Sequence, residues 1–188
     1  MRAATAAVCG AAWLAAACHG DAAKAPSGAR LAVRWTGSDT SSFDAPATAE
    51  RCDSSTMLQI VAIAGDTGIG IALYPSDSNL AAVYTVRPPS LADSAPPAGA
   101  VGLRWFSQTS VQGYQADSGQ VSVTRAPNGA LSGRFKATAR AITGTGRLTL
   151  AGSFDDLRAR RAARGCGTGP APLPAAPDDS EESDEGVD

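Results

Sequence analysis

The chain has 188 residues, a formal net charge of −2, 44% hydrophobic residues and 5% aromatic residues. This length allows one domain of ordinary size with a core large enough to fold alone. Seven of the 18 acidic residues lie between positions 178 and 188, so the remainder of the chain is mildly positive. A chain with so few aromatic residues and no basic stripe is not expected to bind nucleic acid.

The N-terminal segment has the pattern of an export signal. Arg2 precedes an apolar run from Ala3 to Ala17, and no further charged residue occurs before Asp21. This run of fifteen residues is shorter than the roughly 20 residues that a transmembrane helix needs. We therefore expect residues 1–17 to be a signal peptide rather than a permanent membrane span.

The apolar run ends at Cys18. The residues before this cysteine are Leu14 and then three small residues, Ala15, Ala16 and Ala17. This segment resembles the lipobox of bacterial lipoproteins, where signal peptidase II cuts before a cysteine that carries diacylglycerol. The usual leucine position is Ala15 here, and Leu14 lies one place further out. The resemblance implies lipid attachment at Cys18 and a membrane anchor facing the periplasm or the exterior. Because His19 rather than Asp follows the cysteine, the resemblance favours delivery to the outer membrane.

An ordinary signal peptide is the alternative. Cleavage near Ala17 or Ala23 would release a secreted, soluble protein. Either route places the domain outside the cytoplasm, and the lipoprotein route makes residues 18–27 a lipidated tether. This tether contains Ala, Gly, Pro and Ser with few apolar side chains, so it should be flexible.

Two of the four cysteines remain for the folded domain. Cys9 lies in the segment to be removed, and Cys18 is the expected lipid attachment site. In an oxidising compartment, this leaves Cys52 and Cys166 as a disulfide pair. Closing so long a loop would restrict the unfolded chain by roughly 4–5 kcal/mol in the entropic account of disulfides. A redox or metal-binding pair is the other interpretation, but C-x-x-C spacing is absent.

Beyond the tether, apolar residues alternate with a period of two, which is typical of half-buried strands. Leu31 and Trp35 share one face of a predicted strand over residues 31–37. Residues 57–77 predict a hairpin around a turn at Asp66 to Gly68. The first part of the domain is therefore expected to consist of strands.

Prolines divide the middle of the domain. A strand over residues 79–90 must end at Pro88 and Pro89, because proline cannot donate a hydrogen bond to a ladder. A proline-rich loop is expected over residues 88–99, and alternation resumes over residues 100–117.

The clearest alternation lies between residues 119 and 157, where Asn128 and Gly129 form a two-residue hairpin signal. The segments 131–135 and 150–154 share the pattern L-x-G-x-F, which places Leu, Gly and Phe on one face of successive strands. Such a glycine leaves room for a neighbouring ring or marks a bend in the sheet. A ligand that approaches the backbone there is the alternative.

About eight short strands separated by turn signals predict an all-β fold for residues 28–167, either an antiparallel β-sandwich or a small β-barrel. Residues 154–165 contain the one helix-like pattern, although a strand that ends in a basic turn explains them equally well. The arginines of this segment would either contact anionic headgroups or polyanions, or solvate the end of the domain. They are Arg158, Arg160, Arg161 and Arg164. Residues 168–188 pass from Pro and Ala to acidic residues and should form a disordered tail.

The sequence indicates no catalytic site, cofactor or metal. The single histidine, His19, lies in the tether, which excludes Ser-His-Asp and Cys-His arrangements in the domain. The segment GDTGIG lacks the G-K-[ST] ending of a phosphate loop. A calcium site at Asp66 and Asp77 would lack the D-x-D-x-D-G loop. The carboxylates fall mostly at predicted turns, where Asp bonds backbone amides; they are Asp39, Asp44, Glu50, Asp53, Asp66, Asp77, Asp93, Asp117, Asp155 and Asp156.

These patterns predict an envelope lipoprotein whose β domain acts as a non-catalytic binding or interaction module. It would be anchored to the membrane through Cys18 and would hold a partner such as an envelope protein. The alternative is a small β-barrel that binds a small apolar ligand in its interior, either soluble or anchored.

The lipid anchor has a direct test. Mature protein extracted from membranes of an expressing bacterium should have an intact mass that starts at Cys18 and includes acyl groups, because the thiol carries the anchor. A Cys18→Ala variant should lose that mass. A chain that begins at His19 or later without lipid would contradict the anchor.

Overall fold

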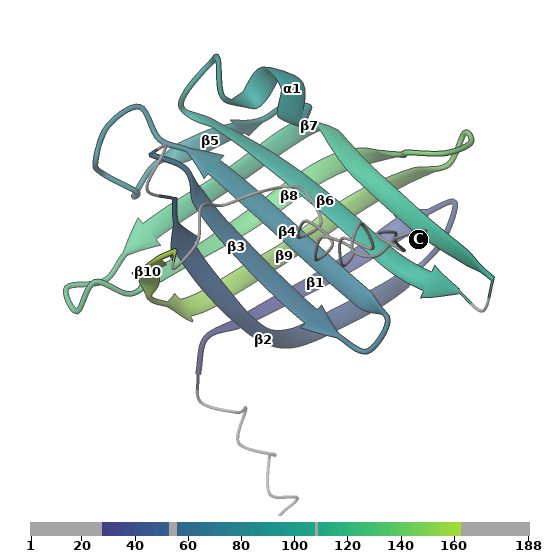
Figure 1. Ribbon diagram of the computed structural model, residues 1–188, viewed down its shortest axis with the longest axis horizontal. Helices are drawn as coiled ribbons and strands as arrows, with labels where there is room; N and C mark the ends of the chain where they lie inside the picture. Colours follow the sequence, from purple (N-terminus) through teal and green to yellow (C-terminus); the bar gives the residue numbers. More distant parts are fainter. Residues whose placement is uncertain (1–27, 53–55, 108, 163–188) are drawn as a thin grey trace, which may run out of the picture.

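The computed structural model describes residues 28–52, 56–107 and 109–162. Within these residues the chain forms ten strands and one single-turn helix, so the all-β prediction is confirmed (Figure 1). The strands are β1 (Arg30–Gly37), β2 (Ser41–Arg51), β3 (Leu58–Ala64), β4 (Thr67–Tyr74), β5 (Val83–Val86), β6 (Ala98–Ser107), β7 (Ser110–Arg125), β8 (Leu131–Ala141), β9 (Arg147–Leu157) and β10 (Ala159–Arg161). The helix α1 covers Pro89–Ala92.

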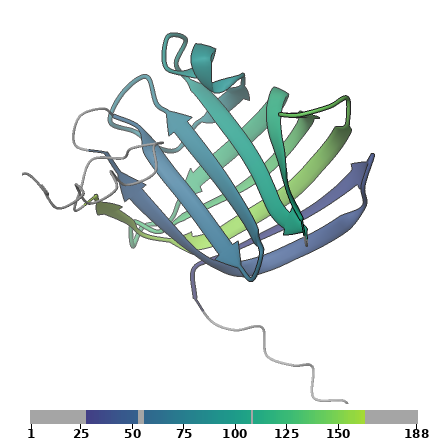
Figure 2. The same cartoon turned by 45° about the vertical axis from the view of Figure 1, so that its right-hand side comes forward.

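Eight of the described strands form one closed antiparallel sheet. β1, β2, β3, β4, β6, β7, β8 and β9 each pair with the next, and β9 returns to β1. Because β1 is paired along both edges, the sheet closes into a barrel, the second of the two predicted architectures (Figure 2). β5 lies between β6 and β7 where these two strands separate, and the short β10 runs parallel to the end of β2.

The connections between strands define two ends of the barrel. The turns that join β1 to β2, β3 to β4, β6 to β7 and β8 to β9 lie at one end, here termed the hairpin end. The other end, termed the loop end, carries β5, α1, the β7–β8 turn and the bend between β9 and β10. β1 starts at the loop end, since Arg30 pairs with Asp155 near the end of β9.

The interior of the barrel is apolar. Inward residues alternate with outward ones along each strand, and the predicted inward residues Leu31 and Trp35 are buried. No charged side chain among the described residues is fully buried. Each large aliphatic side chain that enters this interior contributes about 1.5–3 kcal/mol relative to leaving it in water, so burial drives the closure of the sheet.

The repeated L-x-G-x-F pattern packs two rings against two glycines. β8 and β9 place Gly133 opposite Phe154, and Phe135 opposite Gly152. A Cβ atom at Gly133 would overlap the ring of Phe154, and a Cβ atom at Gly152 would overlap the ring of Phe135. Each ring therefore fills the space that a missing side chain leaves on the neighbouring strand, which confirms the predicted room for a ring.

Two tryptophans meet across the lumen near the hairpin end. Trp35 on β1 and Trp105 on β6 stack with ring centroids 5.7 Å apart, although three strands separate β1 from β6 in either direction around the barrel. Tyr114 on β7 stacks on Trp105 at 5.2 Å, and its hydroxyl lies 3.3 Å from Oγ of Ser38. The Nε1–H of Trp35 is buried without an acceptor in the described structure, a cost on the order of 1–3 kcal/mol that ring packing has to offset.

Strand β2 is absent from the sequence prediction. Ala45, Ala47 and Ala49 supply most of its inward face, and alanine gives only a weak hydrophobic alternation. Pro46 also lies inside the strand. β2 pairs with β1 as far as Pro46 and with β3 from Ala47 onward, so the missing N–H lies where the strand changes partners.

Both predicted hairpins are present, with turns that differ in detail. β4 already begins at Thr67, so the first turn is shorter than predicted. In the second hairpin, the amide of Ala126 donates to the carbonyl of Ala130, and the amide of Gly129 donates to the carbonyl of Ala126. This leaves a turn of three residues rather than two, in which Gly129 adopts a φ of 82°, a left-handed conformation that favours glycine.

The helix interpretation of residues 154–165 is wrong over the part that the structure describes, and the strand interpretation fits. β9 continues to Leu157, which is buried opposite Leu131, and β10 follows. A single-turn helix, α1, lies instead inside the predicted proline-rich loop. No helix in the described ranges is long and apolar enough to cross a membrane.

The two glycines of the repeat should not tolerate a side chain. Gly133→Ala or Gly152→Ala should each lower the free energy of unfolding by about 1–3 kcal/mol, because the new Cβ overpacks against a ring and a carbonyl oxygen. Gly70→Ala is a matched control, since Gly70 faces outward on β4 with no atom within 4 Å of its Cβ position. Urea unfolding compares the three variants, and equal stability of all three would refute this packing.

Candidate functional site

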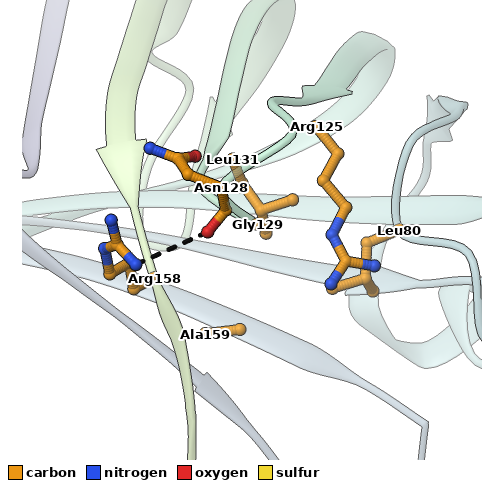
Figure 3. A pocket seen from close by; sticks show the side chains of 7 residues that line it. All are labelled: Leu80, Arg125, Asn128, Gly129, Leu131, Arg158 and Ala159. Carbon is orange, nitrogen blue, oxygen red and sulfur yellow. Dashed lines mark hydrogen bonds between the residues drawn. The ribbon is translucent and has the colours of Figure 1, made fainter.

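A pocket of about 310 Å³ lies at the loop end, where the β7–β8 turn meets the bend between β9 and β10 (Figure 3). Three parts of the chain that are distant in sequence contribute to it. The lining residues are Leu80, Arg125, Asn128, Gly129, Leu131, Arg158 and Ala159. It is termed the arginine pocket below.

The apolar part of the arginine pocket belongs to the end of the core. Leu131 is the first residue of β8, Leu80 lies in the connection before β5, and both are buried. Tyr84 on β5 is also fully buried, and its hydroxyl donates a hydrogen bond to the carbonyl of Leu80 at 3.0 Å. This buried bond holds the connection that carries Leu80 against the barrel.

Two arginines supply the charge of the pocket. Arg125 ends β7, and Arg158 lies between β9 and β10. In the view of Figure 3 they lie on the two sides of the pocket, with Leu131 between them. Neither guanidinium forms an ion pair with a described carboxylate, whereas Arg30 and Arg140 each pair with an aspartate. The positive charge of the pocket is therefore not neutralised by a described neighbour.

Most N–H groups of these two arginines remain free to donate within the described structure. Nη1 of Arg158 donates to the backbone carbonyl of Asn128 at 3.5 Å, and Arg125 has no hydrogen bond to a described residue. A guanidinium offers five donors in a planar fork that matches carboxylate and phosphate oxygens. The turn between the arginines is itself fixed, because the amide of Ala130 donates to Oδ1 of Asn128 at 3.0 Å.

The arginine pocket is suited to binding an anion. None of its lining residues is a carboxylate, imidazole or thiol, so the lining itself offers no general base. Two guanidiniums beside leucine side chains suit a ligand with an anionic head and a short apolar portion. Hydrogen bonds from a charged donor contribute about 1.5–3 kcal/mol each, which is enough to make the head the main determinant of affinity.

The predicted cysteine sites are only partly within the described residues. Cys18 and Cys166 lie outside them, together with the predicted tether and tail. Cys52 is buried and disulfide-bonded. β10 brings the C-terminal part of the chain to this position, since the amide of Ala162 donates to the carbonyl of Arg51 at 3.0 Å. The pairing of Cys52 with Cys166 stays a prediction.

The predicted carboxylate candidates do not converge on one site. Asp66 lies at the hairpin end and Asp77 at the loop end, which rules out a shared calcium site. Asp44 and Asp117 are engaged in ion pairs, and Asp53 lies outside the described residues. The others lie in turns, in connections or towards strand ends; they are Asp39, Glu50, Asp93, Asp155 and Asp156. Within the described ranges, no group of three or more metal-binding side chains is present.

The predicted basic cluster contributes one residue to the arginine pocket. Arg158 lines it, Arg160 and Arg161 are exposed on β10, and Arg164 lies outside the described residues. Arg125 was not singled out by the sequence patterns. Arg125 directly precedes the A-P-N-G turn, which places it at one end of the barrel. The turn lies near Arg158 because β8 pairs with β9, and the sequence pattern does not show which strands pair.

Tyr84→Phe tests the bond that holds the pocket wall. Burial, and then the nearby Asp77 carboxylate, raises the pKa of Tyr84, partly opposed by Arg51. The variant should lower the free energy of unfolding by about 1–2 kcal/mol at neutral pH, because the Leu80 carbonyl loses its donor.

The sign of the pH dependence follows from the raised pKa. Folding favours the neutral phenol, so this stability is complete below the unfolded-state pKa and is lost as pH rises towards the folded-state pKa. Urea unfolding between about pH 7 and 11 should show the difference between wild type and Tyr84→Phe shrinking above about pH 10. A constant difference across that range would contradict the assignment.

Comparison with known proteins assigns no family to this chain. A scan against protein-family models, a search of curated proteins and a search of solved structures each found no match. The ligand class of the arginine pocket therefore follows from its own geometry.

Proposed function

We propose that this protein is a membrane-anchored binding protein of the bacterial envelope that holds a small anionic amphiphile in the arginine pocket. The observation that carries this proposal is the placement of Arg125 and Arg158, neither ion-paired to a described carboxylate, beside the leucines of the pocket. The arginines provide charge and donors for an anionic head. The leucines provide apolar surface for the adjoining part of the ligand.

The start of the barrel supports a position near the membrane. β1 begins with Arg30 at the loop end, which also carries the arginine pocket. A tether of ten residues, 18–27, spans at most about 33–36 Å when fully extended. A lipid at Cys18 would therefore keep the pocket within reach of the membrane surface, where amphiphilic anions concentrate.

Interaction with an envelope protein is a second candidate function. The large apolar side chains that the described structure exposes are concentrated at the hairpin end. Those at this end are Ile63, Phe106, Val111 and Ile142. Exposed apolar patches on soluble domains often mark contact surfaces.

The alternative of a small apolar ligand inside the barrel has less support. The rings of Phe135 and Phe154 occupy the space beside the glycines of the repeat. Trp35 and Trp105 stack across the lumen near the hairpin end. A ligand in the lumen would have to displace these rings. A ligand in the arginine pocket would not, because none of these rings lines that pocket.

Calorimetric titration with octanoate, and with octanol as the neutral probe of equal chain length, tests the arginine pocket. Wild type should bind octanoate and not octanol. The double variant Arg125→Gln/Arg158→Gln should weaken octanoate binding by at least about tenfold, because the charge-assisted hydrogen bonds are lost. Arg87→Gln/Arg104→Gln is the matched control, since both arginines are exposed and lie outside the pocket lining.

Equal losses in the two double variants would contradict a specific site, because they would report net charge alone. The protein could instead bind octanol as tightly as octanoate, with no change in Arg125→Gln/Arg158→Gln. That result would contradict binding in the arginine pocket and favour binding of an apolar ligand in the lumen.

A further inference from the structure

The outer wall of the barrel carries a second group of cations, away from the arginine pocket. Arg34 on β1 and Lys136 on β8 both lie opposite Ala151 on the intervening strand β9. Arg134 faces outward two residues before Lys136 and lies opposite Ser153 of β9. The outer faces of β1, β8 and β9 with these three exposed cations are termed the basic wall.

A shallow groove of about 550 Å³ lies on the basic wall and extends onto the neighbouring strand β2 at residues 42–44. Its floor is low because Ala32, Ala151 and Ser153 have short side chains. Arg34 and Arg134 line the groove from β1 and β8, on the two sides of β9. An elongated ligand lying along β9 would therefore have a cation on each side.

The groove has a net positive charge. Within the described residues, none of Arg34, Arg134 and Lys136 forms an ion pair. The one carboxylate in its lining, Asp44, is neutralised by Arg30, whose Nη2 lies 2.8 Å from Oδ1. Arg34 and Arg134 consequently remain in the groove for an external anion, and Lys136 adds a third cation on the basic wall beside it.

Hydroxyl groups extend this surface towards the hairpin end. Thr36, Thr149 and Thr138 lie side by side on β1, β9 and β8. Each hydroxyl can donate and accept hydrogen bonds. The polar outer face of β9 runs from Ser153 to Arg147, a length of roughly 20 Å at about 3.4 Å per residue.

We propose that the basic wall binds a linear acidic glycan, whose sugar rings carry carboxylates and hydroxyls along an extended chain. The cations on both sides of β9 match the carboxylates, and the threonine row matches the sugar hydroxyls. This site lies on the side of the barrel and the arginine pocket lies at its end, so the inference is independent of the proposed function.

Two other anionic partners fit the basic wall less well. Single-stranded nucleic acid binds largely by stacking on aromatic side chains, and the outward residues of β1, β8 and β9 include none. A bilayer surface favours exposed apolar side chains beside the cations. The large apolar residues that the described structure exposes lie on none of these three strands.

Binding of the exported full chain to fluorescently labelled alginate oligomers tests the proposal, with labelled dextran as the neutral glycan. Wild type should bind alginate and not dextran, and more weakly as NaCl rises from about 50 to about 300 mM. The triple variant Arg34→Gln/Arg134→Gln/Lys136→Gln should lose at least about tenfold in affinity. The control triple Arg87→Gln/Arg104→Gln/Arg160→Gln removes the same charge elsewhere and should lose less than about twofold.

Equal losses in both triple variants, or equal binding of alginate and dextran, would overturn the proposal. The protein could instead bind single-stranded DNA or phosphatidylglycerol vesicles more tightly than alginate. If the triple variant Arg34→Gln/Arg134→Gln/Lys136→Gln lost that binding, the result would overturn the proposal in favour of that partner. Urea unfolding checks that this triple variant is folded. The single variants Arg34→Gln and Lys136→Gln, each expected to weaken alginate binding, provide the same test should the triple variant not fold.

Discussion

The pairing of β1 with both β2 and β9 is the constraint on which the barrel depends. It joins the first described strand to the last long one, so neither half of the chain can bury its apolar face without the other. The entropy of closing such distant contacts is repaid only when the whole ring of strands has formed. The same closure places β1 and β6 on opposite sides, which is why Trp35 and Trp105 meet across the lumen.

Closure also separates the chemistry of the molecule into an apolar inside and a polar outside. Rings and aliphatic chains occupy the interior, with no fully buried charged side chain in the described part. The two proposed binding sites lie at the loop end and on the outer wall, where Arg125 ends β7 and Arg134 lies on β8. The two proposed sites differ in shape, because one is a pocket beside leucines and the other a shallow groove lined by residues of β8, β9, β1 and β2.

The sequence patterns predict inward faces well wherever large apolar residues alternate with polar ones, as at Leu31 and Trp35. They also predict the ring-over-glycine packing, because L-x-G-x-F occurs on two successive strands. Strand β2 is hidden by alanines and by Pro46, whose effect depends on a change of partner strand. The placement of Arg125 and Arg158 around one pocket is hidden as well, because alternation shows which face of a strand is buried and not which strand lies beside it.

The aromatic stack gives the barrel an internal optical probe. The chain has three tryptophans, and Trp13 lies in the segment expected to be removed on export. The remaining two indoles belong to opposite walls and lie 5.7 Å apart between ring centroids, close enough for their electronic transitions to couple. Their joint circular dichroism and emission therefore depend on the separation of the walls, so a chain without residues 1–17 reports the opening of its own lumen without an added label.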